Sequence, residues 1–146
     1  MRVILTAAAL TVAAACSGQT ASTETPTATQ SVTAPTEDAR FIAVMSYADW
    51  CGSCKALDPK VKAVQTANTF DGVEFFTLDY TDRNEDAFFA GAATLGVEAT
   101  LRQTFSTKVK TGKLYLIERE TGAIVSTIDK SMSEAEIAQA IEGATV

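Results

Sequence analysis

The sequence predicts an α/β fold in which a central mixed β-sheet carries helices on both faces. Three observations predict it: strands and helices alternate through the first half, two strands then follow one another across a turn, and a helix closes the chain. The expected elements are strand 41–47, helix 53–68, strand 73–78, helix 85–95, strand 114–118, strand 123–128 and helix 133–142.

The first strand and helix have clear local signals. An apolar run at 41–45 is typical of a buried strand. Leu57, Val61 and Val64 then recur at i, i+4 and i+7, so they share one buried face of a helix. The segment 70–72, Phe-Asp-Gly, interrupts the chain before the next strand. Together these signals predict a β-α-β unit.

The last third of the sequence predicts a β-hairpin followed by a helix. Residues 114–118 and 123–128 flank Glu-Thr-Gly, a turn in which Gly122 suits a positive φ. Ser133 and Glu136 stand three positions apart, the spacing of a capping box, and so mark the start of the final helix.

The stretch 96–113 is harder to assign. Val97, Leu101, Phe105 and Val109 recur every four residues, so part of it extends the preceding helix or forms another. We consider two roles for this stretch, a helical elaboration packed on the core and a partner-recognition element.

The N-terminus has the layout of a secretory signal peptide, which we assign to residues 1–15. Arg2 precedes an apolar run of about 13 residues, too short for the roughly 20 that span a bilayer. The small residues before Cys16 resemble the lipobox of bacterial lipoproteins, although Ala13 stands where Leu is usual. The resemblance implies that Cys16 carries lipid, and Ser17 implies the outer membrane. The alternative is a plain secretory signal, with Cys16 lost or left free.

Two further regions follow the signal. Residues 16–37 are rich in Ser, Thr, Ala and Pro and cannot bury enough surface to fold, so we expect a disordered tether. Residues 38–146 have the size of a single domain.

Composition excludes several classes of function. The formal net charge is −6, which argues against nucleic-acid binding. No basic cluster is present to hold anionic lipids, so we expect membrane attachment only through lipid on Cys16. The chain has no histidine, which excludes histidine-based catalysis and most zinc and copper sites.

The most informative motif is Trp-Cys-Gly-Ser-Cys-Lys at residues 50–55. Two cysteines three positions apart can close a disulfide when the first begins a helix, where free N–H groups and the helix dipole stabilise a thiolate. The thiolate is the species that attacks disulfides, so the motif indicates thiol–disulfide exchange. Three cysteines is an odd count, and lipid on Cys16 would leave Cys51 and Cys54 as one pair.

Residues 47–55, Tyr-Ala-Asp-Trp-Cys-Gly-Ser-Cys-Lys, with Pro59 five positions after the second cysteine, resemble the thioredoxin superfamily. This motif is most similar to that of the C-terminal thioredoxin domain of bacterial transmembrane thiol:disulfide interchange proteins. This resemblance implies a thioredoxin-like fold over 38–146. It also implies an exposed attacking thiol at Cys51 and a resolving thiol at Cys54.

The resemblance further implies a substrate-docking surface around the cysteine pair. Its expected members are Trp50, Gly52, Ser53, Thr111 and Gly112. For Trp50 the alternative is simple packing.

Two features depart from the family pattern. Thioredoxins carry a cis-proline just before the strand at 114–118, where this chain has Lys-Thr-Gly-Lys at 110–113. Met45 stands six residues before the first cysteine, where many thioredoxins bury an aspartate that helps the resolving thiol lose its proton. Because the cis-proline is missing, the resemblance does not define the affinity for substrates, and metal binding by the two thiols stays an alternative.

The sequence therefore predicts an exported, periplasmic thiol–disulfide oxidoreductase that uses Cys51 and Cys54 on protein disulfides without an organic cofactor. The resemblance favours reduction, with electrons from a membrane thiol:disulfide donor. Two alternatives stay open. One is a Cu(I)-binding module that uses both thiolates, and the other is an interaction module in which the disulfide is only structural.

Overall fold

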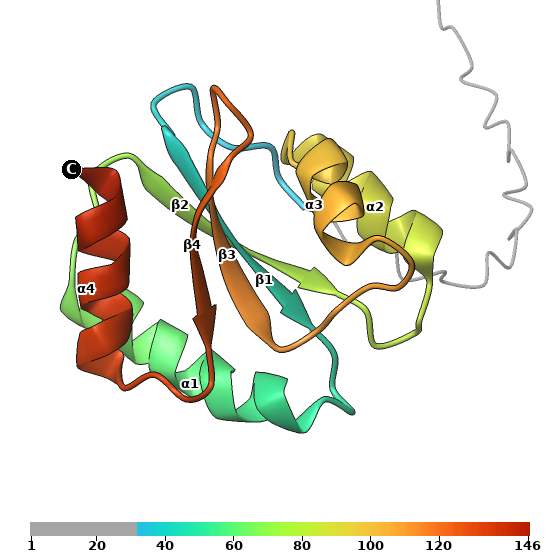
Figure 1. The fold of residues 1–146 in the computed structure, drawn as a ribbon, viewed down its shortest axis with the longest axis horizontal. Coiled ribbons are helices and arrows are strands. Elements are labelled where there is room, and N and C mark those ends of the chain that lie inside the picture. The colour runs from blue at the N-terminus through green and yellow to red at the C-terminus, as the bar shows by residue number, and fades with distance from the viewer. Residues whose placement is uncertain (1–31) are drawn as a thin grey trace, which may run out of the picture.

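The computed structural model describes residues 32–146, which form a four-stranded sheet between two pairs of helices (Figure 1). The elements are β1 (Phe41–Tyr47), α1 (Gly52–Ala67), β2 (Val73–Asp79), α2 (Glu85–Thr94), α3 (Glu98–Phe105), β3 (Lys113–Glu118), β4 (Ile124–Asp129) and α4 (Glu134–Thr145). The predicted signal peptide, Cys16 and most of the predicted tether lie outside the described residues.

The sheet is mixed, with strand order β2-β1-β3-β4. Strand β1 pairs with β2 in parallel and with β3 antiparallel, and β3 pairs antiparallel with β4. The crossover through α1 requires the parallel pair, and the short turn after β3 requires the antiparallel one. The predicted α/β class, with a mixed sheet flanked by helices on both faces, is therefore confirmed.

Each face of the sheet covers its own apolar core. Side chains alternate along β1, so Ala43 and Met45 face the core beneath α1 and α4, whereas Ile42 and Val44 face the core beneath α2 and α3. Figure 1 shows α1 and α4 on one side of the strands and α2 and α3 on the other. The central position of β1 buries it on both faces.

Helix α3 occupies 8 residues of the stretch 96–113, for which the sequence predicted either an extended or a separate helix. Its Leu101 and Phe105 are buried in the core beneath α2, and the Phe105 ring centroid lies 6.0 Å from that of Phe88. The helix is followed by its C-cap residue, Ser106, which has a positive φ of 60°. The packing favours the helical elaboration over a free recognition element for this segment.

Residues 32–37, which we placed in the tether, contact the domain in this structure. Val32 packs against the core beneath α2 and α3. The Thr36 N–H donates to the Glu74 carboxylate at 3.2 Å, and Arg119 donates to the Thr36 carbonyl at 2.6 Å. Contacts with the sheet thus begin before Asp38. Among residues 32–146, the helices are all too short or too polar to cross a membrane.

Candidate functional site

The cysteine pair lies where β1 delivers the chain to the first turn of α1. Cys51 is the N-cap residue, with an extended backbone at φ −88° and ψ 108°. Its sulfur accepts the Cys54 N–H at 3.2 Å, and the same N–H also donates to the Cys51 carbonyl at 3.1 Å. Cys51 and Cys54 form a disulfide, with their Cα atoms 5.3 Å apart.

The two cysteine residues differ in exposure. Cys54 is fully buried in the core beneath α1 and α4, whereas Cys51 retains 9% of its surface. Gly52, beside Cys51, is exposed and would leave an added Cβ with no heavy atom within 4 Å. The structure therefore leaves open space next to Cys51, on its Gly52 side. The roles of attacking and resolving thiol stay predictions.

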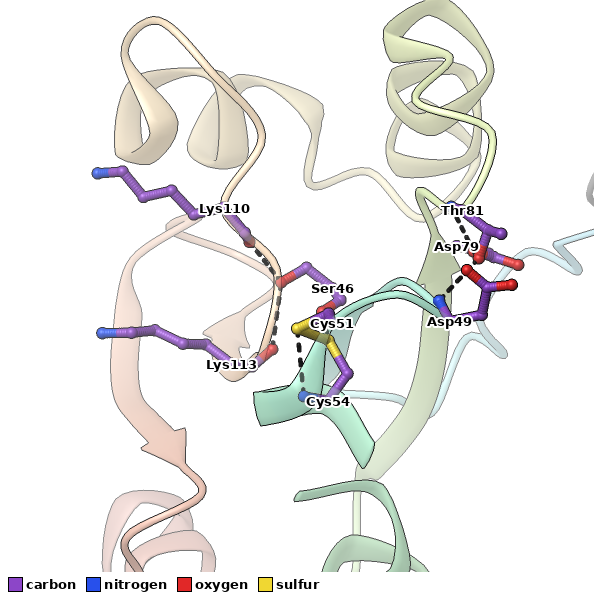
Figure 2. Close-up of a disulfide and its surroundings, with 8 residues drawn as sticks. All are labelled: Ser46, Asp49, Cys51, Cys54, Asp79, Thr81, Lys110 and Lys113. Carbon is purple, nitrogen blue, oxygen red and sulfur yellow. Dashed lines mark hydrogen bonds between the residues drawn. A yellow bond between two sulfur atoms is a disulfide. The ribbon is translucent and has the colours of Figure 1, made fainter. Parts of the chain in front are cut away.

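Residues 110–113, which we call the Gly112 loop, approach the disulfide from the opposite side (Figure 2). An added Cβ at Gly112 would lie 2.7 Å from the Ser53 Cβ and 3.3 Å from the Cys51 sulfur. Gly112 also has a φ of +88°, a conformation that glycine adopts without strain. The side chains of Lys110 and Lys113 extend away from the disulfide. The predicted docking residues Ser53 and Gly112 thus meet, and Thr111 lies half-buried beside them.

Ser46 holds this loop and was not singled out from the sequence. It is fully buried near the end of β1, and its hydroxyl donates to the Lys110 carbonyl at 2.7 Å. Its own carbonyl oxygen accepts the Gly112 N–H at 2.8 Å and lies 3.7 Å from the Cys54 sulfur. The one signal in the sequence is a hydroxyl within an otherwise apolar strand.

Trp50, on the other flank of Cys51, leans on the turn that follows β2. Its indole N–H donates to the Thr81 carbonyl at 2.9 Å, and the Arg83 guanidinium lies 4.7 Å from its ring centroid. The Tyr80 ring meets Trp50 edge-on at 6.5 Å. Trp50 remains 47% exposed, more than any other aromatic side chain in the described part of the chain. Its position therefore combines packing with a free face.

The same turn is braced by Thr81. Its hydroxyl accepts the Asp49 N–H at 3.0 Å, and Asp79 in turn accepts both the hydroxyl and the N–H of Thr81. Thr81 and Arg83 were not predicted as part of the site. Their contacts join residues about thirty positions apart, which no local pattern indicates.

Met45 lies in the core, 2% exposed, so β1 offers no carboxylate at that position. Within residues 32–146, no three or more His, Cys, Asp or Glu side chains gather in a group that could hold a metal ion. A metal ion at this site would therefore be bound by the two cysteine sulfurs, with no third ligand from a His, Cys, Asp or Glu side chain of residues 32–146.

Comparison with known proteins identifies the family. Residues 23–130 match the model of the family described as Thioredoxin, so this chain belongs to the thioredoxin family. Protein disulfide isomerase-like 1-4 from Arabidopsis thaliana is 39% identical over 49 residues, which cover 34% of this chain and 8% of that protein. The match thus spans a small part of that relative.

Similar solved structures include the following two. StoA from Bacillus subtilis is 16% identical with a TM-score of 0.49, and the match covers 73% of this chain and 84% of that one. A mutant thioredoxin from Halobacterium salinarum NRC-1 is 21% identical with a TM-score of 0.48, and the match covers 75% of this chain and 78% of that one.

Proposed function

We propose that this member of the thioredoxin family is an exported thiol–disulfide oxidoreductase that reduces disulfides in protein substrates. The observation that carries the proposal is the Cys51 sulfur, which sits at the N-terminus of α1 and accepts the Cys54 N–H. The same N–H group and the helix dipole would stabilise a Cys51 thiolate once the disulfide is reduced.

The reaction has two steps. The Cys51 thiolate attacks one sulfur of the substrate disulfide; that bond breaks, a mixed disulfide forms, and the departing substrate sulfur takes up a proton. Cys54 then loses its proton and attacks the Cys51 sulfur, which releases the second substrate thiol and closes the Cys51–Cys54 disulfide. Two electrons pass to the substrate, and no organic cofactor is needed.

The burial of the two sulfurs supports this assignment of roles. A bulky protein disulfide can reach Cys51 past the open space at Gly52, but it cannot reach the fully buried Cys54. The Cys54 thiol of the reduced protein would have the Ser46 carbonyl oxygen 3.7 Å away as an acceptor. That contact favours the protonated thiol and keeps Cys54 in reserve for the second step.

Residues 1–16 support export and lipid anchoring in this proposal. An apolar run with a preceding Arg2 ends at Cys16, so lipid on Cys16 would tether the domain in the periplasm, at the outer membrane. A periplasmic reductant needs a supply of electrons, for which a membrane thiol:disulfide donor is our proposed partner. Metabolic labelling with palmitate tests the anchor, since Cys16→Ala should abolish label that the parent chain carries.

The deciding experiment is the reduction potential of the Cys51–Cys54 pair in the full chain. The protein is equilibrated with defined ratios of reduced and oxidised dithiothreitol or glutathione, and the free thiols are alkylated and counted. A reductant should give a value near the roughly −270 mV of thioredoxin. A value of about −120 to −180 mV would assign an oxidant or isomerase instead.

Turnover is measured on insulin, with dithiothreitol as the electron source. The parent chain should accelerate insulin reduction, and Cys51→Ser should return the rate to the background given by dithiothreitol alone. Equal rates for the two proteins would reject the enzymatic proposal in favour of a structural disulfide.

A further inference from the structure

Ser46 is the one polar side chain that is fully buried among residues 32–146. Alternation along β1 directs its side chain to the face that bears Ile42 and Val44, where an apolar residue would be expected. Burial of a hydroxyl in such a place costs solvation free energy unless the hydroxyl is hydrogen-bonded. Its partners therefore indicate what it does.

The hydroxyl and the carbonyl oxygen of Ser46 both bond to the loop beside the cysteine pair. The hydroxyl donates to the Lys110 carbonyl at 2.7 Å and lies 3.3 Å from the Lys113 carbonyl, the two ends of the Gly112 loop. The carbonyl oxygen accepts the Gly112 N–H at 2.8 Å, in the middle of that loop. One residue thus holds the loop at three positions, and Figure 2 shows the two contacts that its hydroxyl makes with Lys110 and Lys113.

The loop depends on these contacts because residues 110–113 do not by themselves restrict its backbone conformation. Gly112 has the widest conformational freedom of any residue type, and no proline stands in residues 110–113 to restrict the backbone. Yet Gly112 packs so closely on Ser53 and Cys51 that an added Cβ would collide. A small displacement of the loop would therefore change the surface that a substrate meets beside Cys51.

We propose that Ser46 is a positioning residue that sets the Gly112 loop against the Cys51–Cys54 pair and thereby determines the affinity for protein disulfides. The inference rests on the proposed function, because it concerns how that reaction binds its substrate. Ser46 acts through the loop and does not touch the substrate. A small disulfide, which needs only the sulfur of Cys51, should be insensitive to it.

The experiment compares Ser46→Thr with Ser46→Val. The Thr and Val side chains are nearly isosteric and differ in one hydroxyl, so the comparison separates the hydrogen bond from any effect of extra volume in the strand. Ser46→Ala serves as a third variant that adds no volume. Insulin reduction gives kcat and KM, reduction of glutathione disulfide reports on the thiol chemistry, and amide hydrogen exchange reports on the Gly112 N–H. All are measured well below the unfolding midpoint of the least stable variant.

We expect Ser46→Val to raise the KM for insulin about fivefold or more above that of Ser46→Thr, the effect of one lost hydrogen bond. Exchange at the Gly112 N–H should quicken by a similar factor, relative to the other amides of β3. The rate with glutathione disulfide should stay within about twofold between the two variants, because both keep the backbone carbonyl of Ser46 beside Cys54 and the helix start at Cys51. If Ser46→Ala folds, it should behave as Ser46→Val does.

Equal KM values and equal Gly112 exchange for the Thr and Val variants would overturn the inference. So would a parallel loss on insulin and on glutathione disulfide, which would assign Ser46 to the sulfur chemistry itself. If the parent chain reduces no insulin, the proposed function fails. The exchange comparison at Gly112 then still decides whether Ser46 holds the loop.

Discussion

The two segments that meet at the disulfide are built in different ways. Residues 51–54 are fixed locally, since the Cys51 sulfur accepts the N–H of a residue three positions away and the first turn of α1 completes the geometry. The Gly112 loop is fixed from a distance, because its anchors in Ser46 lie 64 and 67 residues away in the chain. One side of the site therefore follows from the local sequence, and the other exists only in the folded sheet.

This difference separates chemistry from recognition. The local segment supplies the two sulfurs and the helix start that favours a thiolate. The Gly112 loop supplies a surface close to Cys51, held by one hydroxyl and one backbone bond. Changes in the local segment should therefore alter the steps of exchange, and changes in the loop should alter binding and stability.

The largest effect should come from the cysteines themselves. Cys54→Ser leaves a nucleophile without a resolving partner, so the mixed disulfide with insulin chains should accumulate as a covalent adduct seen by non-reducing electrophoresis and mass spectrometry. Cys51→Ser should give no adduct, because Cys54 is fully buried. Adducts formed equally by both variants would contradict the division of roles between the two sulfurs.

A second prediction compares glycines on the two sides of the disulfide. Gly112→Ala forces a non-glycine residue to a φ of +88° at roughly 1–3 kcal/mol, and its Cβ collides with Ser53, so we expect a total loss of more than about 3 kcal/mol in unfolding free energy. Gly52→Ala meets no atom within 4 Å and should change stability by less than about 1 kcal/mol. Denaturant unfolding measures both.

The control for this pair is Gly143→Ala, in the exposed part of α4 with nothing within 4 Å of the added Cβ. It should stabilise the protein by about 0.5–1 kcal/mol through helix propensity alone. A Gly112→Ala variant as stable as Gly52→Ala would show that the loop moves freely, and would break the contrast between the two segments.

A third prediction concerns Trp50, which directly precedes the local segment and is anchored on the turn after β2. Trp50→Phe keeps a smaller aromatic ring next to Tyr80 and Arg83 and removes the indole N–H that donates to the Thr81 carbonyl at 2.9 Å. We expect a loss of about 0.5–1.5 kcal/mol in unfolding free energy, the net value of one hydrogen bond.

Tyr80→Phe is the matched control, because it also removes one polar group from the same aromatic pair. The Tyr80 hydroxyl lies 3.5 Å from Glu85, too long for a strong hydrogen bond, so the change should stay within about 0.5 kcal/mol. If the two variants lose the same stability, the indole hydrogen bond is not what anchors Trp50.

The same contrast explains which parts of the fold could be predicted from the sequence. The strand at 41–47 was predicted with its observed ends, and the final helix was predicted from the Ser133 capping box, because both depend on neighbours in the chain. Helix α1 begins one residue before the predicted start, since Cys51 itself is the cap. Local periodicity was sufficient for these elements.

The remainder of the site depends on pairings that local patterns do not contain. Gly112 was placed near the cysteines by family resemblance, and its contact with Ser53 arises only when β3 pairs with β1. In the sequence Ser46 is an ordinary strand residue, and its hydrogen bond to the Lys110 carbonyl forms only in the folded structure. The anchoring of Trp50 by Thr81 likewise requires the register between β1 and β2.

The smallest effect should come from a local device remote from the disulfide, the capping box of α4. The backbone N–H of Ser133, and then its hydroxyl, donate to the Glu136 carboxylate and hold the pKa of Glu136 below its ordinary value. A lowered folded-state pKa means a stabilising contribution that is present above the unfolded value of about 4.3 and is lost as pH falls through the folded value. Glu136→Gln should thus lower Tm by at most a few degrees at neutral pH, and the difference from the parent should shrink in acid.

Glu134→Gln removes the same charge from the same first turn without touching the capping box, and so separates the helix dipole from the hydrogen bonds. The acid-sensitive difference should belong to Glu136 alone, measured as Tm against pH by circular dichroism. Because the box involves only neighbours in the chain, the difference should be the same in a Ser46→Val background. A dependence on Ser46 would mean that α4 and the Gly112 loop are coupled through the sheet, and the division into local and long-range construction would fail.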